Sequence, residues 1–140
     1  MCKNLRKIEC ITFLLLLFSL KLSAPDWNSF TVVELSPVEP YRKLVYAIGM
    51  VETNGDTLAY NPAEDAAGYF QIRPIRLIDY NIRTRSNYTR QDLFNFDTSA
   101  KIFLYFADLV GPYNLELIAR KWNGSGHQTI NYWNRIKRYL

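Results

Sequence analysis

Glu52 has the sequence position best suited to acid chemistry. It lies four residues after Ile48 and eight after Leu44, so its carboxyl group shares the core-facing stripe of an expected helix. Burial disfavours the charged carboxylate, and the negative end of the helix dipole acts in the same direction, so both raise the pKa. A glutamic acid that stays protonated near neutral pH can act as a general acid. The alternative interpretation is an exposed acid at a helix end.

Two further segments pair an amide side chain with aromatic neighbours. The run from Gly68 to Ile72 contains Gln71, and a glycine at its start lets the backbone approach a ligand. Asn123 follows Trp122 and precedes a Gly-Ser loop. Sugars present apolar ring faces edged with hydroxyls, which suit flat side chains and amides better than charged groups. The two segments indicate a sugar-binding site, although the first run is also compatible with a strand in the core.

Taken together, these segments resemble the soluble lytic transglycosylases of the lysozyme-like superfamily. That family carries a helix-borne Glu-Ser, then Gly-Leu-Met-Gln-Ile, then Ala-Tyr-Asn-Ala-Gly. The corresponding residues here are Glu52-Thr53, Gly68-Tyr69-Phe70-Gln71-Ile72 and Lys121-Trp122-Asn123-Gly124-Ser125. A fourth element, a threonine followed three residues later by Tyr-Val, is matched by Thr129 and Tyr132-Trp133. Order and spacing agree from about residue 41 to residue 140.

The resemblance implies cleavage of the MurNAc to GlcNAc linkage of peptidoglycan. Glu52 would first protonate the glycosidic oxygen and then, as a base, take the proton of the MurNAc 6-hydroxyl. That hydroxyl closes on the anomeric carbon to give a 1,6-anhydro end, so one carboxylate suffices where most glycoside hydrolases need two. The residues implied in substrate binding are Thr53, Gly68, Tyr69, Phe70, Gln71, Trp122, Asn123 and Tyr132.

The matching segments depart from the family pattern at three places. Trp122 stands where the family has tyrosine, so a phenolic hydroxyl beside Glu52 would have to come from Tyr132. Thr53 keeps the hydroxyl of the usual serine. Tyr69-Phe70 replace leucine and methionine, which predicts a bulkier and more aromatic groove wall.

Two other functions stay open on the sequence. Glu64 and Asp65 lie in the loop after Glu52, where a hydrolytic muramidase of similar fold would place a second carboxylate. We interpret both as solvated loop acids. The other alternative is a catalytically inactive glycan-binding or structural module of a cell-envelope or phage assembly. The presence of Glu52 at the end of a patterned helix favours the enzyme.

The residues above are expected to be positioned by a single lysozyme-like domain over residues 37–140. Its fold class is predicted to be mainly α, and α+β at most. A first helix runs from about Pro40 to Glu52 or Asn54, and residues 56–72 form a loop with at most a short strand pair. A second helix has Pro74 in its first turn and carries Ile75, Leu77, Ile78 and Ile82. Three more are marked by apolar residues: one beginning near Asp97 and ended by Gly111-Pro112, one with Leu115, Ile118 and Trp122, and one with Ile130, Trp133, Ile136 and Leu140.

The N-terminal residues 1–24, here called the leader, and the composition of the remaining chain predict the cellular location of the protein. In the 140-residue chain, residues 1–24 combine early basic residues with the apolar run from Ile11 to Leu20, which is typical of a signal peptide with Ala24 as the last residue removed. Residues 25–36 are expected to form an extended lead-in. Without the leader's four basic residues and one acid the formal charge falls from +4 to +1, and both cysteines are lost.

From these features we expect an exported protein, periplasmic or associated with the cell envelope, that acts on peptidoglycan glycan strands. It would be a monomer, with an envelope-spanning assembly as a possible context. No dense basic patch indicates nucleic acid. No cofactor is predicted and no metal site, since His127 is the only histidine and we interpret it as a surface loop residue.

Overall fold

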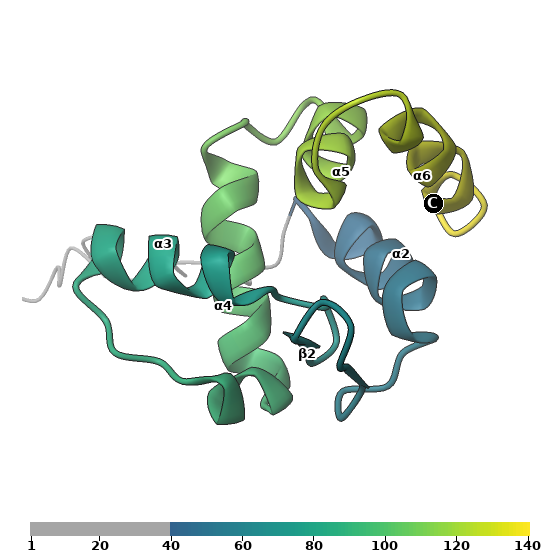
Figure 1. Cartoon of the computed structure of the whole chain (residues 1–140). Helices are drawn as coiled ribbons and strands as arrows, with labels where there is room; N and C mark the ends of the chain where they lie inside the picture. Colours follow the sequence, from purple (N-terminus) through teal and green to yellow (C-terminus); the bar gives the residue numbers. More distant parts are fainter. Residues whose placement is uncertain (1–39) are drawn as a thin grey trace, which may run out of the picture. The chain divides into compact units, whose positions relative to one another are not determined.

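A computed structural model describes residues 40–140 of the chain. The predicted signal peptide 1–24 and lead-in 25–36 lie outside these residues. The described part contains the five α-helices α2 to α6, one 3₁₀ helix and a single two-stranded sheet, so the prediction of a mainly helical chain is confirmed. Figure 1 shows the order of these elements along the chain.

The predicted first helix is α2, Arg42–Thr53. Its apolar stripe is buried, with Leu44 and Ile48 inaccessible to solvent. The helix ends because Asn54 adopts the left-handed conformation with φ 55°, which asparagine tolerates better than most residues. Glu52 therefore lies in the last turn of α2, at the negative end of the helix dipole.

After α2 the chain forms a small antiparallel sheet of β1, Tyr60–Asn61, and β2, Ala66–Ala67, which confirms the expected strand pair. Gly68 follows β2 with φ 75°, and a Cβ atom there would lie 2.0 Å from the backbone oxygen of Leu93. Only glycine fits this turn, because both the backbone angle and the close approach exclude a side chain. The turn brings residues 68–72 back toward the end of α2.

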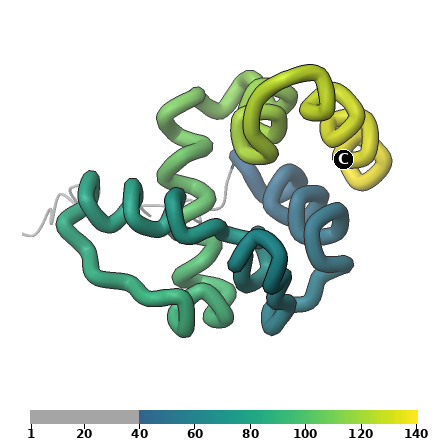
Figure 2. Tube along the Cα trace, in the orientation of Figure 1, coloured from purple at the N-terminus to yellow at the C-terminus, as the bar shows by residue number. Residues whose placement is uncertain are grey.

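The remaining elements confirm the predicted helices and add one short element. They are α3, Pro74–Thr84; the 3₁₀ helix η1, Arg90–Phe94; α4, Phe96–Asp108; α5, Leu115–Asn123; and α6, Gln128–Ile136. Packing contacts join α5 to α6, α2 to both of them, and α4 to α5. In the tube of Figure 2, α2 runs beside the α5–α6 pair.

Aromatic rings occupy the centre of the core. Phe70 from the 68–72 turn stacks on Phe103 of α4, with ring centroids 4.8 Å apart and nearly parallel planes. Trp122 of α5 meets Phe103 edge to face at 5.0 Å. These contacts tie the turn after β2 to α4 and α5, and so fix the position of the turn relative to the helices.

The helix α3 forms where Pro74 predicts it, but most of its apolar residues lie on the surface. Leu77 is buried, whereas Ile75, Ile78 and Ile82 are 73%, 53% and 72% exposed. Tyr80 takes a core position through ring contacts with Tyr105 and Phe106. Helical spacing therefore predicted the element correctly without indicating which of its faces is buried.

Candidate active site

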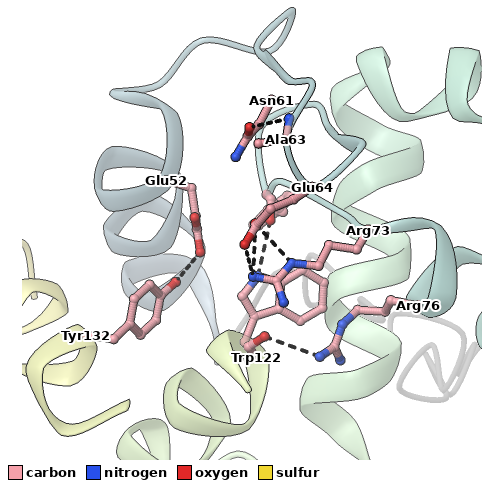
Figure 3. A network of polar contacts seen from close by, with 9 residues as sticks. Glu52, Asn61, Ala63, Glu64, Arg73, Arg76, Trp122 and Tyr132 are labelled. Carbon is pink, nitrogen blue, oxygen red and sulfur yellow. Dashed lines mark hydrogen bonds and ion pairs between the residues drawn. The ribbon is translucent and has the colours of Figure 1, made fainter. Parts of the chain in front are cut away.

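The carboxyl group of Glu52 is half-buried and hydrogen-bonded to a residue 80 positions away in the sequence. The hydroxyl of Tyr132, on α6, donates to Glu52 Oε1 at 2.7 Å. Tyr132 is only 1% exposed. Tyr132 therefore supplies the phenolic hydroxyl beside Glu52 that a tyrosine at position 122 would otherwise have offered. Figure 3 shows the pair at the end of α2.

Burial sets the protonation of this pair. Desolvation raises the pKa of Glu52, and it outweighs the lowering effects of the Tyr132 hydrogen bond and of Arg135 and Arg73. The negative charge of Glu64 raises the pKa further. Burial, followed by the charge of Glu52, also raises the pKa of the Tyr132 phenol, so Tyr132 stays a neutral donor. Glu52 thus holds its proton to higher pH than an ordinary glutamate does.

Glu52 opens onto a pocket of about 100 Å³ that brings together three parts of the chain. Gln71 comes from the turn after β2, and Asn123 and Gly124 come from the end of α5. The sequence predicted that Glu52, Gln71 and Asn123 would share a groove, and they line the same pocket. The other lining residues are Glu64, Arg73, Ile75, Arg76 and Trp122.

Gln71 is held in a strained conformation by its own loop. Its φ is 48°, and its amide nitrogen donates to the backbone oxygens of Ala59 at 3.3 Å and Gly68 at 3.1 Å. Both amide protons are thereby engaged in holding the loop, so only the amide oxygen is left for a ligand. Gln71 is therefore suited to accept a hydrogen bond from a hydroxyl group.

Thr53 positions the site from outside the pocket. Its hydroxyl lies 3.0 Å from the backbone oxygen of Gly49 and 3.2 Å from that of Tyr69. The first contact is within α2, and the second joins α2 to the 68–72 turn. Thr53 was predicted to bind substrate. Its hydroxyl instead holds α2, the helix that carries Glu52, against the turn that carries Gln71.

The prediction of an aromatic groove wall at Tyr69-Phe70 is wrong. Phe70 is fully buried against Phe103, and Tyr69 is buried with its ring pressed against Gly49. Gly68 is also enclosed by the backbone of the chain. Of residues 68–71, only Gln71 lines the pocket. Tyr69 and Phe70 support the site by packing.

Trp122 lines the pocket but does not offer a free ring face for a sugar. It is buried, and its indole nitrogen donates to the Phe70 backbone oxygen at 3.2 Å. The guanidinium of Arg76 lies 4.3 Å from the centre of its ring. We expected Asn123 to lie beside a Trp122 ring face free to stack on a sugar. In the structure the Arg76 guanidinium covers that ring, so Asn123 lies beside a cation instead.

Sequence reasoning missed the pair formed by Glu64 and Arg73. Arg73 Nε and Nη2 donate to the two oxygens of Glu64 at 3.1 and 2.9 Å, and both residues line the Glu52 pocket. Figure 3 shows this pair opposite Glu52. Glu64 therefore belongs to the site, whereas Asp65 pairs with Arg90 at 2.7 Å beside a different cavity. The one available signal was Arg73 immediately after the Gly-Tyr-Phe-Gln-Ile run.

A metal-binding group, a membrane-spanning helix and the position of the histidine can each be judged within residues 40–140. Among them, no three His, Cys, Asp or Glu side chains are grouped to hold a metal ion. None of the helices in this part of the chain is long and apolar enough to cross a membrane. His127 is exposed before the first turn of α6, as predicted. Searches with family models, among curated proteins and among solved structures find no match to the chain.

Proposed function

We propose that this protein is a peptidoglycan lytic transglycosylase, with Glu52 as the single acid and base. The observation that supports the proposal most directly is the environment of Glu52. Its pKa is raised by burial, Tyr132 orders one of its oxygens, and it shares a pocket with Gln71 and Asn123. A poised proton donor that shares its pocket with two neutral amides can meet the glycosidic oxygen and the hydroxyl groups of a glycan.

In the proposed reaction the protonated Glu52 donates its proton to the glycosidic oxygen as the bond to the MurNAc anomeric carbon breaks. The carboxylate then accepts the proton of the MurNAc 6-hydroxyl, and that oxygen bonds to the anomeric carbon. The products are a 1,6-anhydro end and a free GlcNAc 4-hydroxyl, and no water is consumed. Tyr132 keeps the carboxyl group in one orientation for both proton transfers.

Glu64 favours a second candidate, a hydrolytic muramidase. Its carboxylate lines the same pocket as Glu52, where a general base for water or a nucleophile would stand. Against this, both of its oxygens accept hydrogen bonds from Arg73. Because both oxygens of Glu64 are held by Arg73, this carboxylate is less available to a water molecule or to the anomeric carbon, so we prefer the mechanism with one carboxylate.

The Glu52→Gln variant tests whether Glu52 transfers a proton. Glutamine keeps the size and the hydrogen-bonding oxygen, so glycan binding should survive while cleavage of sacculi falls by at least ~100-fold. Glu116→Gln is the matched control, because Glu116 pairs with Arg120 on α5 and lies outside the pocket. Full activity in Glu52→Gln would refute the assignment.

Mass spectrometry of the muropeptides separates the candidates. Anhydro ends support the transglycosylase, reducing ends support the muramidase, and binding without products leaves only an inactive glycan-binding module. Under the proposal, Glu64→Gln retains most activity and still yields anhydro ends. If Glu64→Gln abolished turnover with the fold intact, the two-carboxylate hydrolase would replace it.

The proposed substrate lies outside the cytoplasmic membrane, so we also propose that residues 1–24 direct export. The protein in the periplasmic or envelope fraction should then begin at Pro25 or within a few residues of it. N-terminal sequencing of that fraction measures this directly. A chain recovered only from the cytosol with Met1 in place would overturn the export proposal.

A further inference from the structure

The exposed side of α3 is apolar. Ile75, Ile78 and Ile82 lie at positions i, i+3 and i+7, so they project from one side of the helix. All three are exposed, whereas Leu77 and Tyr80 hold the opposite side of α3 in the core. We call the three exposed side chains the isoleucine ridge. Large apolar side chains gathered on one exposed side, unlike single ones, are typical of a surface that meets an apolar partner.

An apolar hollow continues the ridge toward η1. Its volume is about 210 Å³, and Ile78 belongs to both the ridge and the hollow. Its two charged lining residues, Asp65 and Arg90, form an ion pair at 2.7 Å and so neutralise each other. The other lining residues are all apolar: Ile72, Pro74, Leu77, Ile78 and Leu93. The hollow is too small for a whole small-molecule ligand, but it has room for part of a hydrocarbon chain.

Arginines border the isoleucine ridge. Residues 73–85 contain one acid, Asp79, and four arginines, Arg73, Arg76, Arg83 and Arg85. Asp79 pairs with Arg83, and Glu64 from outside this segment pairs with Arg73. Four arginines and these two acids leave a net charge of +2. Arg85 is exposed and has no hydrogen-bonding or ion-pair partner among residues 40–140. The ridge therefore lies in a surface of net positive charge.

This combination suits the surface of an anionic membrane. A helix that lies on a membrane places its apolar side at the boundary of the acyl chains and its cations at the phosphate groups. Arginine side chains are long, so their guanidinium groups can stay among the headgroups while neighbouring isoleucines insert more deeply. The negative potential of an anionic surface also attracts the net positive charge of this part of the protein.

A second copy of this chain fits the ridge less well. In a two-fold dimer the same edge of α3 from each copy would meet. The edge beside the ridge carries Arg76 and Arg83 with Asp79 as its single acid, so two net positive edges would repel each other. A bilayer of anionic lipid presents the opposite charge and no fixed shape, so it accommodates the ridge without this repulsion.

We propose that α3 docks on the surface of a membrane that contains anionic phospholipids. The isoleucine ridge enters the acyl-chain boundary, the hollow at Ile78 receives part of a lipid chain, and Arg83 and Arg85 meet phosphate groups. Leu77 and Tyr80 keep α3 attached to the core, so docking requires no unfolding. The inference does not rest on the proposed function, because lipid binding makes no use of Glu52.

NMR of the isoleucine methyl groups tests docking at the ridge itself. The full chain, isotope-labelled at these methyl groups, is titrated with nanodiscs of phosphatidylglycerol and phosphatidylcholine in about equal amounts that carry a spin-labelled lipid. A local measurement is needed because the apolar run of the leader also has affinity for lipid. We expect the signals of Ile75, Ile78 and Ile82 to broaden. Those of Ile130 and Ile136 should stay sharp, because α6 lies at the opposite side of the helical domain from α3 in Figure 1.

Matched substitutions locate the docking surface. Ile82→Ser should raise the lipid concentration for half-maximal broadening of Ile78 about tenfold, because one large apolar side chain no longer enters the bilayer. Leu58→Ser is its control and should change nothing, because Leu58 is 70% exposed in the loop before β1 and lies outside α3. Arg85→Gln should raise the same concentration about fivefold. Lys137→Gln removes a charge from an exposed position after α6 and should leave it unchanged.

Several results would overturn the proposal. Equal broadening with phosphatidylcholine alone would remove the role of the arginines, and equal effects of the control variants would place the contact elsewhere. Broadening when the protein is concentrated without lipid would assign the ridge to a second copy, and no broadening with any nanodisc would leave it to a partner protein. Ile82→Ser should cleave sacculi as the parent does, because Ile82 lies outside the Glu52 pocket, so lipid binding and cleavage are tested separately.

Discussion

Replacing Tyr132 by phenylalanine removes one oxygen atom from the proposed active site. That atom donates the 2.7 Å hydrogen bond to Glu52 Oε1 from a side chain that is almost fully buried. Phenylalanine fills the same space, so packing in α6 is kept and the measured change reports the hydrogen bond.

The size of the effect follows from the charge of the acceptor. A hydrogen bond to a charged group contributes about 1.5–3 kcal/mol, against ~1 kcal/mol between neutral groups. The stability cost of Tyr132→Phe should therefore be about 1.5–3 kcal/mol where Glu52 is ionised and smaller where it is protonated. Because the bond favours the charged form, its loss also raises the pKa of Glu52 above that of the parent.

The kinetic assay is the pH profile of kcat/KM for glycan cleavage. Activity falls at high pH as the general acid loses its proton, so in Tyr132→Phe this fall should move to higher pH. The stability cost, measured by urea unfolding, should grow as pH rises through the pKa of Glu52.

Tyr41→Phe is the matched control. Tyr41 is also buried, and its hydroxyl donates to Asp108 Oδ1 at 2.6 Å. Asp108 is exposed, so the stability cost should be equal or smaller, and the pH profile of cleavage should not move. If Tyr132→Phe left the profile unchanged, or if Tyr41→Phe shifted it equally, the role assigned to the Tyr132 bond would be refuted.

Two further predictions concern the helix that carries Glu52. Burial raises the pKa of Glu52 in the folded state, so the parent loses stability as pH rises above the unfolded value of about 4.3. Below that pH, Glu52→Gln should have the same free energy of unfolding in urea as the parent. At neutral pH the variant should be the more stable protein, and a lower free energy of unfolding there would contradict the burial effect. A Cβ atom at Gly49 would lie 1.9 Å from the Tyr69 ring, so Gly49→Ala should cost about 1–3 kcal/mol. Adding Tyr69→Leu should recover part of that loss, and unchanged thermal stability of Gly49→Ala alone would show that the ring moves freely.

The sequence by itself determined the α-helices among residues 40–140. Apolar spacing predicted α2, and Asn54-Gly55 predicted where it ends, because helix formation and capping depend on residues within a few positions of each other. Pro74 marked the start of α3 for the same reason. The position of Glu52 on the core-facing stripe at the end of a helix could also be predicted, because it depends only on nearby residues.

Tertiary structure alone decided which side chains form the site. Tyr132 meets Glu52 across 80 residues, and Glu64 meets Arg73 through the fold of the strand pair. Phe70 turns into the core while Gln71, its neighbour, faces the pocket. Such outcomes depend on which surfaces α4, α5 and α6 present once they have packed, and the spacing of residues within one segment carries no information about the surface it will meet.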